Sequence, residues 1–373
     1  MKPELEKCCA EYIANRDTVK KAFRFNDAAI WSVCASLFCA CGHTADAERL
    51  KACRRVLKKH TRPFSKFRGK AQPFLSCMLA VGDSVEERMA LANDYFRLLK
   101  RNFKKSEYLV LAAFLLTDLA DQPLTEEKAA RGKEIYRRMN KKHRLLTNKT
   151  DSVFAMLMAY SDKTDGELLE DMDACYDALK TKFSNGSGIQ TAAQVLSVAA
   201  GTPEEKTQRV IDLFNALEEA DVKYGKSDEL APLAALSLAD ASIDELAEEI
   251  KAADEFLAEQ KIWKSGDKEK AEQSMHALMI VSNLYADTGR VNVTVMTNTL
   301  DMLFAKQQAS RFSFAVQALQ ALLQYAVGSK DKTDKSTDSE QTKTDSTPAG
   351  ADTAPAGADA APAESGAGQQ PEK

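Results

Sequence analysis

Glycine, proline and aromatic side chains are scarce in this chain of 373 residues, and so are long apolar runs. The chain has 16 glycines and 10 prolines, and only 7% of its residues are aromatic. No stretch shows sustained alternation of apolar and polar residues or paired turn residues, so the sequence argues against a β-sheet. No run approaches the roughly 18 apolar residues of a membrane-spanning helix, so we expect no membrane partner.

The first residues have no apolar core of signal-peptide length and carry acids as early as Glu4. We therefore expect a cytoplasmic protein whose eight cysteines are thiols. Cys34 and Cys39 lie within an apolar run at near-helical spacing, without the CxxC spacing of zinc sites. Buried thiols are expected there, and no bound metal.

Sequences that carry known catalytic chemistry are absent as well. The four histidines form neither HExxH nor a helical pair, and no nucleophile elbow, Walker loop or GxGxxG occurs. The glycine-containing loop at Asn185 lacks a following lysine and a preceding strand. The acidic cluster 167–173 is typical of a solvated helix face. We expect no cofactor, and the sequence supports no enzymatic activity without excluding one.

The sequence does contain a repeat of about forty residues. Each unit has an apolar, alanine-rich first half, a short polar break and an amphipathic second half. Successive breaks are 38 to 41 residues apart and lie at Gly42, Asp83, Asp121, Asp162, Gly201 and Asp240. Anchors in the second halves, 38 to 43 residues apart, repeat this period at Cys53, Phe96, Tyr136, Tyr176, Phe214 and Phe256.

This pattern predicts one helix pair per unit. The second helix of a pair has an apolar stripe and begins with capping chemistry, as at Thr202, Ser242 and Ser84. A single pair cannot bury its apolar face, so neighbouring pairs must stack. We predict an all-α fold, an α-solenoid of about seven stacked helix pairs over residues 1–328, with an irregular helical bundle as the alternative.

The last part of the chain differs in composition. A looser seventh pair is expected within residues 274–307, and an apolar segment at 311–327 is expected to close the stack. Residues 329–373 are polar and repeat PAGAD, so they cannot bury enough apolar surface to offset the entropy of ordering. We predict a disordered tail there.

Charge is distributed unevenly along the chain. Residues 1–150 carry 31 Lys and Arg against 17 Asp and Glu, whereas residues 151–329 carry 15 against 29. The pattern RRxxKKH begins at Arg54 and again at Arg137, two repeat periods later. Aligned second helices predict a basic ridge of Arg54, Arg55, Lys58, Lys59, Arg97, Lys100, Arg101, Arg137, Arg138, Lys141 and Lys142. The ridge suits anionic groups, but cations near a helix C-terminus also stabilise the helix dipole.

Polar residues precede several of the predicted first helices at matching repeat positions. Because equivalent loops stack along one edge of a solenoid, we predict a polar loop rim formed by Arg68, His143, Thr147, Asp151 and Gln190. The rim is a candidate binding site. Helix capping and hydrogen bonds between loops are the alternative use of the same side chains.

These residues resemble motifs of an uncharacterised bacterial family, the domain-of-unknown-function 4003 family. Its FR, HxxLT…D and GN-x-LQ features are similar to Phe67-Arg68, to His143-RLL-Thr147 with Asp151, and to the loop before Gln190. The resemblance covers most of residues 20–285. This chain has a single acid after Thr147 where the family tends to have two, and Asn185-Gly186 reverses the family's GN order. The resemblance implies no activity.

Three hypotheses of function follow. The first is a non-enzymatic binding or scaffold protein for an acidic protein or peptide partner, and the second is a nucleic-acid binder that uses the basic ridge. The third is a small-ligand or enzymatic site at the loop rim near His143, Asp151 and Gln190. Surface aromatics are not interleaved with the ridge, which favours a protein partner over single-stranded nucleic acid.

Overall fold

The fold is described from a computed structural model of the chain. It describes residues 1–285 except 27, 120–121, 150, 228 and 264–265; residues 286–373 are not described. Contacts divide the chain into two units, Met1–Asp331 and Lys332–Lys373, and everything below concerns the first. The closing segment at 311–327 and the tail predicted from the sequence lie outside the described residues.

In its described part the first unit is entirely helical, which confirms the predicted fold class. The helices are α1 (Pro3–Ala22), α2 (Ala28–Ala40), α3 (Ala47–Lys59), η1 (Lys66–Arg68), α4 (Gln72–Ala80), α5 (Val85–Asn102), α6 (Glu107–Leu115), η2 (Leu116–Asp118), α7 (Glu126–Lys142), α8 (Asp151–Met158), α9 (Asp165–Leu179), α10 (Gly186–Val198), α11 (Pro203–Glu219), α12 (Leu230–Ser237), α13 (Ile243–Glu259) and α14 (Asp267–Ser282).

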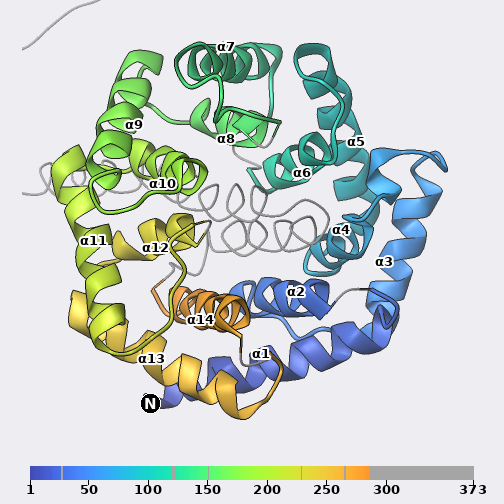
Figure 1. The fold of residues 1–373 in the computed structure, drawn as a ribbon. Coiled ribbons are helices and arrows are strands. Elements are labelled where there is room, and N and C mark those ends of the chain that lie inside the picture. Colours follow the sequence, from blue (N-terminus) through green and yellow to red (C-terminus); the bar gives the residue numbers. More distant parts are fainter. Residues whose placement is uncertain (27, 120–121, 150, 228, 264–265, 286–373) are drawn as a thin grey trace, which may run out of the picture. The chain divides into compact units, whose positions relative to one another are not determined.

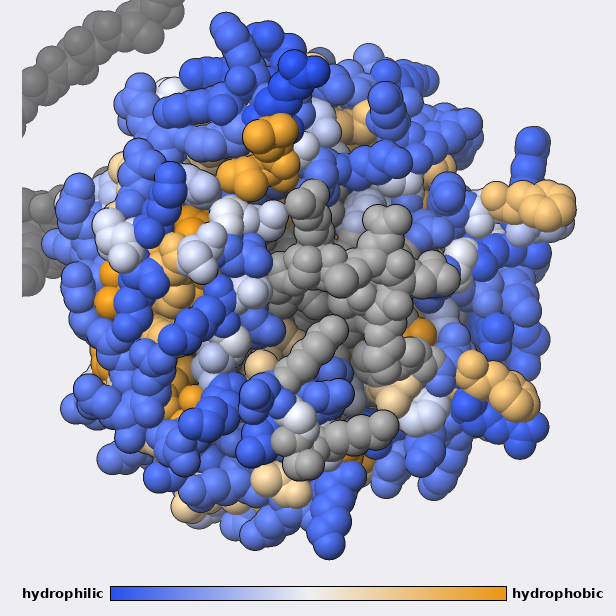
Figure 2. All heavy atoms as spheres, viewed as in Figure 1, coloured by the Kyte–Doolittle hydropathy of each residue, from blue (hydrophilic) through white to orange (hydrophobic). Residues whose placement is uncertain are grey.

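Even-numbered helices form an inner layer and odd-numbered helices an outer layer (Figure 1). The inner helices are apolar on almost every side, so their residues are buried all round, as from Leu109 to Leu115 in α6. The outer helices bury one stripe, and in α7 it consists of Ala129, Gly132, Ile135 and Met139. Three- and four-residue steps place these side chains on one face of a helix. The outward surface is mainly hydrophilic (Figure 2).

Helix-start chemistry fixes where the outer helices begin. Thr202 accepts a hydrogen bond from the Glu205 N–H, and the Glu205 side chain accepts from the Thr202 N–H, which completes a capping box. Ser242 caps α13 through the Glu245 N–H. Ser84 precedes α5 but makes no side-chain cap hydrogen bond, so the predicted cap is present at two of these three positions.

The two ends of the stack meet, which the repeat period did not predict. Each outer helix contacts the next, and α13 contacts α1; among the inner helices, α14 contacts α2 (Figure 1). The Lys2 ammonium lies 2.5 Å from a carboxylate oxygen of Glu245 and 2.7 Å from one of Glu249. Helix α1 therefore takes the seventh outer position, and the helices of this unit form a closed ring rather than an open stack.

Among the described residues, an arginine at a repeated position joins an outer helix to the next inner helix at three places. Arg49 of α3 donates to the Ala80 and Gly82 carbonyls, both at 2.6 Å, at the C-terminal end of α4. Equivalent bonds run from Arg131 of α7 to the carbonyls that follow α8, and from Arg209 of α11 to carbonyls at and after the last residue of α12. These carbonyls have no partner within their own helix, so each arginine satisfies acceptors that the helix leaves free.

Candidate functional site

The connections between helices lie on two opposite edges of the ring. Outer and inner helices alternate along the chain, so the seven connections from an outer to an inner helix occupy equivalent positions in the repeat and are expected to share one edge. We call this the basic edge; it comprises residues 23–27, 60–71, 103–106, 143–150, 180–185, 220–229 and 260–266. The connections from inner to outer helices form the opposite edge.

The two edges carry opposite charge. Among described residues, the basic edge has 14 Lys and Arg against 2 Asp and Glu. On the opposite edge the described connections have one cation, Lys163, against five acids. Cations at the C-terminal ends of the outer helices and acids before their N-terminal ends complement the helix dipoles, which accounts for part of the pattern. The dipoles do not account for cations far into the loops, such as Lys66 and Lys149.

The duplicated RRxxKKH block has the same structural role at both sites. Lys59 and His60, at the end of α3, both contact the Glu86 carboxylate at the start of α5. Two pairs later, Lys142 and His143 both contact the Asp173 carboxylate of α9, and His143 Nε2 lies 2.7 Å from Asp173 Oδ1. Each copy therefore links its outer helix to the next outer helix along the chain. The two copies are two repeat periods apart because they occupy the same position in two repeat units.

The rest of the predicted basic ridge divides into paired and unpaired cations. Arg54 donates to Gln72 at 2.9 Å, and other ridge cations pair with nearby acids, namely Arg97 with Asp94, Arg101 with Glu126, and Arg137 with Glu134. Five ridge side chains are exposed and have no such partner among the described residues: Arg55, Lys58, Lys100, Arg138 and Lys141. These five stand on three neighbouring outer helices, near the ends that border the basic edge.

The predicted loop rim separates into three places. Arg68 donates to the Thr61 hydroxyl at 3.0 Å and to the Lys58 and Thr61 carbonyls, so it caps the end of α3. His143 turns to Asp173 and packs against the Tyr176 ring, with ring centroids 5.4 Å apart. Only Thr147, Asp151 and Gln190 stay in one neighbourhood, at the start of α8 and in α10.

Asp151 is the centre of a buried polar cluster between α8 and α10. Its carboxylate accepts from the Asn148 N–H at 2.6 Å, from Gln190 Nε2 at 3.0 Å and from Gln194 Nε2 at 2.7 Å. Burial raises the pKa of Asp151 above its ordinary value, and the three donors oppose that rise because they stabilise the charged form. The cluster therefore ties two inner helices together through one carboxylate.

The sequence analysis missed Gln194. A glutamine four residues after Gln190, on an otherwise apolar helix, was the available signal, because this spacing places both amides on one face. The amide oxygens of Gln190 and Gln194 and the Thr147 hydroxyl are buried without a hydrogen-bond partner. Buried polar groups of this kind commonly bind ordered water, so these atoms are compatible with a structural role.

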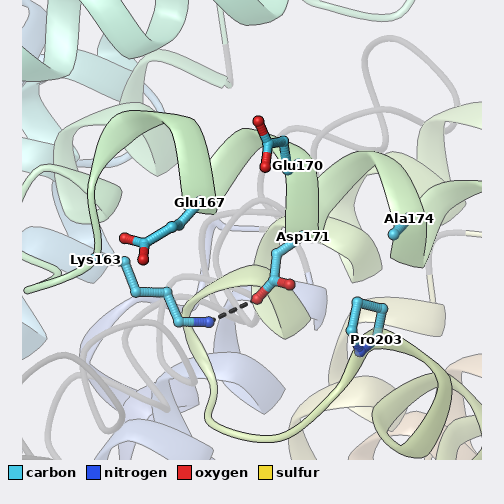
Figure 3. A pocket seen from close by; sticks show the side chains of 6 residues that line it. All are labelled: Lys163, Glu167, Glu170, Asp171, Ala174 and Pro203. Carbon is cyan, nitrogen blue, oxygen red and sulfur yellow. Dashed lines mark hydrogen bonds and ion pairs between the residues drawn. The ribbon is translucent and has the colours of Figure 1, made fainter.

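A pocket of about 410 Å³ lies on the opposite edge, between α9 and α11 (Figure 3). Asp171 accepts from the Lys163 ammonium at 2.6 Å and from the Lys206 ammonium at 3.1 Å. Both lysines also donate to the Ala199 carbonyl after α10. Asp171 occupies the repeat position that is Arg131 in α7 and Arg209 in α11. Lys163 and Lys206 donate to the carbonyl after α10 in place of an arginine at that position. The polar groups that meet in this pocket already serve the framework.

The cysteines and the possible metal ligands add no further centre. All eight cysteines are free thiols, and burial raises the pKa of Cys39 to about 12. Within the described ranges, no three His, Cys, Asp or Glu side chains are arranged to hold a metal ion. In the same residues, no helix has the length and apolar character needed to cross a membrane.

These features define a helical-repeat protein with a closed ring of helix pairs and oppositely charged edges. The model of one protein family, DUF4003, described as a protein of unknown function, matches residues 15–309. The chain belongs to this family. No curated protein and no solved structure matches the chain.

Proposed function

We propose that this protein is a non-catalytic binding module that holds an anionic partner on its basic edge. The observation that supports this most directly is the segregation of charge, because the described loops of one edge carry 14 cations and only two acids. The five unpaired ridge cations extend the positive surface onto the outer helices. Such a surface attracts anionic groups and raises the rate of encounter with them, most strongly at low ionic strength.

The polar clusters inside the ring favour binding over catalysis. The Asp151 carboxylate is committed to three donors, His143 to Asp173, and Asp171 to two lysines. A general acid, base or nucleophile needs to reach a substrate, and these groups are held by the framework instead. The third hypothesis, a site at the loop rim, is supported less because the rim residues separate.

The lack of surface aromatics along the basic ridge favours an acidic protein or peptide segment over nucleic acid as the partner. Either partner would contact the same cations. Exposed cations contact closely spaced carboxylates or phosphates through charge alone, so the affinity should fall as salt rises. Specificity would then come from the spacing of the cations around the ring, with one to four described cations in each connection of the basic edge.

The test uses the full chain and two labelled probes, a polyglutamate peptide and a single-stranded oligonucleotide. A variant in which Lys58, Lys100 and Lys141 are changed to Glu should bind its preferred probe at least about tenfold more weakly at low salt. The matched control changes Lys7, Lys51 and Lys251 to Glu; these exposed lysines lie on outer helices, away from the helix ends that border the basic edge. Equal losses in both variants would refute the proposal, and so would a failure at low salt to bind either probe or any other polyanionic surface.

A further inference from the structure

Three loops of the basic edge carry large apolar side chains that are almost fully exposed. Phe25 after α1 is 88% exposed, Phe64 after α3 is 102% exposed, and Leu145 after α7 is 91% exposed. Among the described residues, two further large apolar side chains are exposed, Met1 at 53% and Leu91 at 38%. Figure 2 shows a mainly hydrophilic face with apolar side chains beside α3 and the end of α1 and over α8, and a broader apolar area beside α11. We call these three residues the apolar tips.

Each apolar tip has at least one cation beside it in its loop. Phe25 follows Arg24, whose guanidinium lies 4.5 Å from the centre of the Phe25 ring. Phe64 lies between Arg62 and Lys66, and no acid occurs anywhere in residues 60–71. Leu145 follows Arg144, and Lys149 lies in the same loop. The combination repeats on three separate helix pairs, so it is not an accident of one flexible loop.

The arrangement of the tips restricts what can cover them. The three loops that carry the tips occupy equivalent positions in the repeat, although they belong to different helix pairs. The tips are separated by whole helix pairs in the sequence, which favours a broad partner surface over a short extended peptide. Phe rings can stack on nucleic-acid bases, but Leu145 has no such use. A broad surface with anionic groups on the outside and an apolar layer beneath them could contact all three tips and their cations at once.

We propose that the basic edge docks on the surface of an anionic phospholipid membrane, with Phe25, Phe64 and Leu145 entering the headgroup region. This rests on the proposed function and names its partner as lipid rather than polypeptide. The flanking arginines and lysines contact lipid phosphates, and the tips remove apolar surface from water. The sequence led us to expect no membrane partner because no apolar run spans a bilayer, but docking at the surface requires no such run.

The first experiment is co-sedimentation of the full chain with vesicles. Vesicles of phosphatidylcholine with about one third phosphatidylserine should bind the chain, and pure phosphatidylcholine vesicles should bind it weakly, because both charge and tips are needed. Raising the salt from about 0.05 M to about 0.5 M should reduce binding without abolishing it, since salt screens charges but leaves the apolar contact.

Tip variants separate insertion from simple charge attraction. Changing Phe25, Phe64 or Leu145 to Ser keeps every charge and removes only an exposed side chain, so folding should be unaffected. Each change should weaken binding to anionic vesicles roughly tenfold, a factor that corresponds to about 1.4 kcal/mol. Leu91→Ser is the control, because Leu91 lies on outer helix α5 away from the edge. Phe64→Trp should bind, and its fluorescence should shift to shorter wavelength on anionic vesicles.

The outcomes distinguish this inference from the proposed function. Loss of vesicle binding in the tip variants, but not in Leu91→Ser, supports docking by insertion. Vesicle binding that the tip variants leave unchanged, or binding to polyglutamate or the oligonucleotide without vesicle binding, overturns the lipid inference and leaves the anion-binding function standing. Failure to bind vesicles and both probes overturns the two together.

Discussion

His276 makes the closed ring sensitive to acid. It lies on α14 at the seam where the last described inner helix meets α1, it is 0% exposed, and neither ring nitrogen has a hydrogen-bond partner. Its ring packs between Tyr12, with centroids 5.8 Å apart, and Trp263, at 5.3 Å. Burial, with a smaller contribution from the Arg16 charge, lowers the pKa of His276 from 6.5 to about 3.

The sign of the effect follows from where the proton binds. As the pH falls through 6.5 the unfolded chain protonates His276, whereas the folded chain stays neutral until about pH 3. Between these values the unfolded state holds more protons, so the free energy of unfolding decreases as the pH falls, by up to about 1.4 kcal/mol per unit. From pH 7 to pH 5 this residue alone should cost about 2 kcal/mol of stability.

The measurement is urea unfolding of the full chain at several pH values between 5 and 7.5. His276→Phe keeps an aromatic ring at the seam but cannot bind a proton, so its stability should decrease less, by about 2 kcal/mol over that range, than that of the wild type. His276→Leu provides a second neutral side chain if phenylalanine packs poorly. His43→Asn, at an exposed histidine, should keep the acid dependence of the wild type. Parallel curves for wild type and both His276 variants would refute the reasoning.

Two further predictions concern the framework. Asp151→Ala leaves the Asn148 N–H and the amides of Gln190 and Gln194 without their acceptor, so it should lower the free energy of unfolding by about 3 kcal/mol in urea; an unchanged midpoint would contradict this role. Arg131→Ala removes donors to the carbonyls after α8 and should cost about 1–3 kcal/mol, whereas Arg137→Ala, whose partner is one exposed acid three residues away, should cost less than about 0.5 kcal/mol. Equal losses of thermal stability in the two arginine variants would be inconsistent with this difference.

Much of the fold was readable because local and global signals agree. The alternation of an all-round apolar helix with a striped one is visible in single segments, such as 107–115 and 126–142, and the structure places these segments inside and outside. The breaks were readable because capping residues such as Thr202 act within a few residues of sequence. Caps that depend on loop geometry could not be predicted. Ser84 is of the right residue type for a cap, but the residue type alone does not determine whether its side chain makes the capping hydrogen bond.

The candidate sites were harder to predict because side-chain partners come from distant units. Loop position suggested that Arg68, His143 and Asp151 share a rim. In the structure Arg68 bonds to the end of α3, His143 to an acid of α9, and Asp151 to the backbone before α8. The unpaired ridge cations could not be told from the paired ones, since Glu86 and Asp173 lie about thirty residues from the cations they bind. The repeat period aligns backbone positions, whereas charge pairing depends on the particular residues of the neighbouring unit.

The function proposed for the edges depends on closure of the ring. The repeat period indicates that helix pairs stack, but it does not determine the angle by which each pair is rotated relative to the next. An open superhelix and a closed ring therefore have the same sequence signature. Here the contacts of α1 with α13 and of α14 with α2 close the circle. In an open superhelix the loops would wind along an axis and face many directions. In a ring they share one side, so cations and apolar tips from separate pairs can act on a single surface.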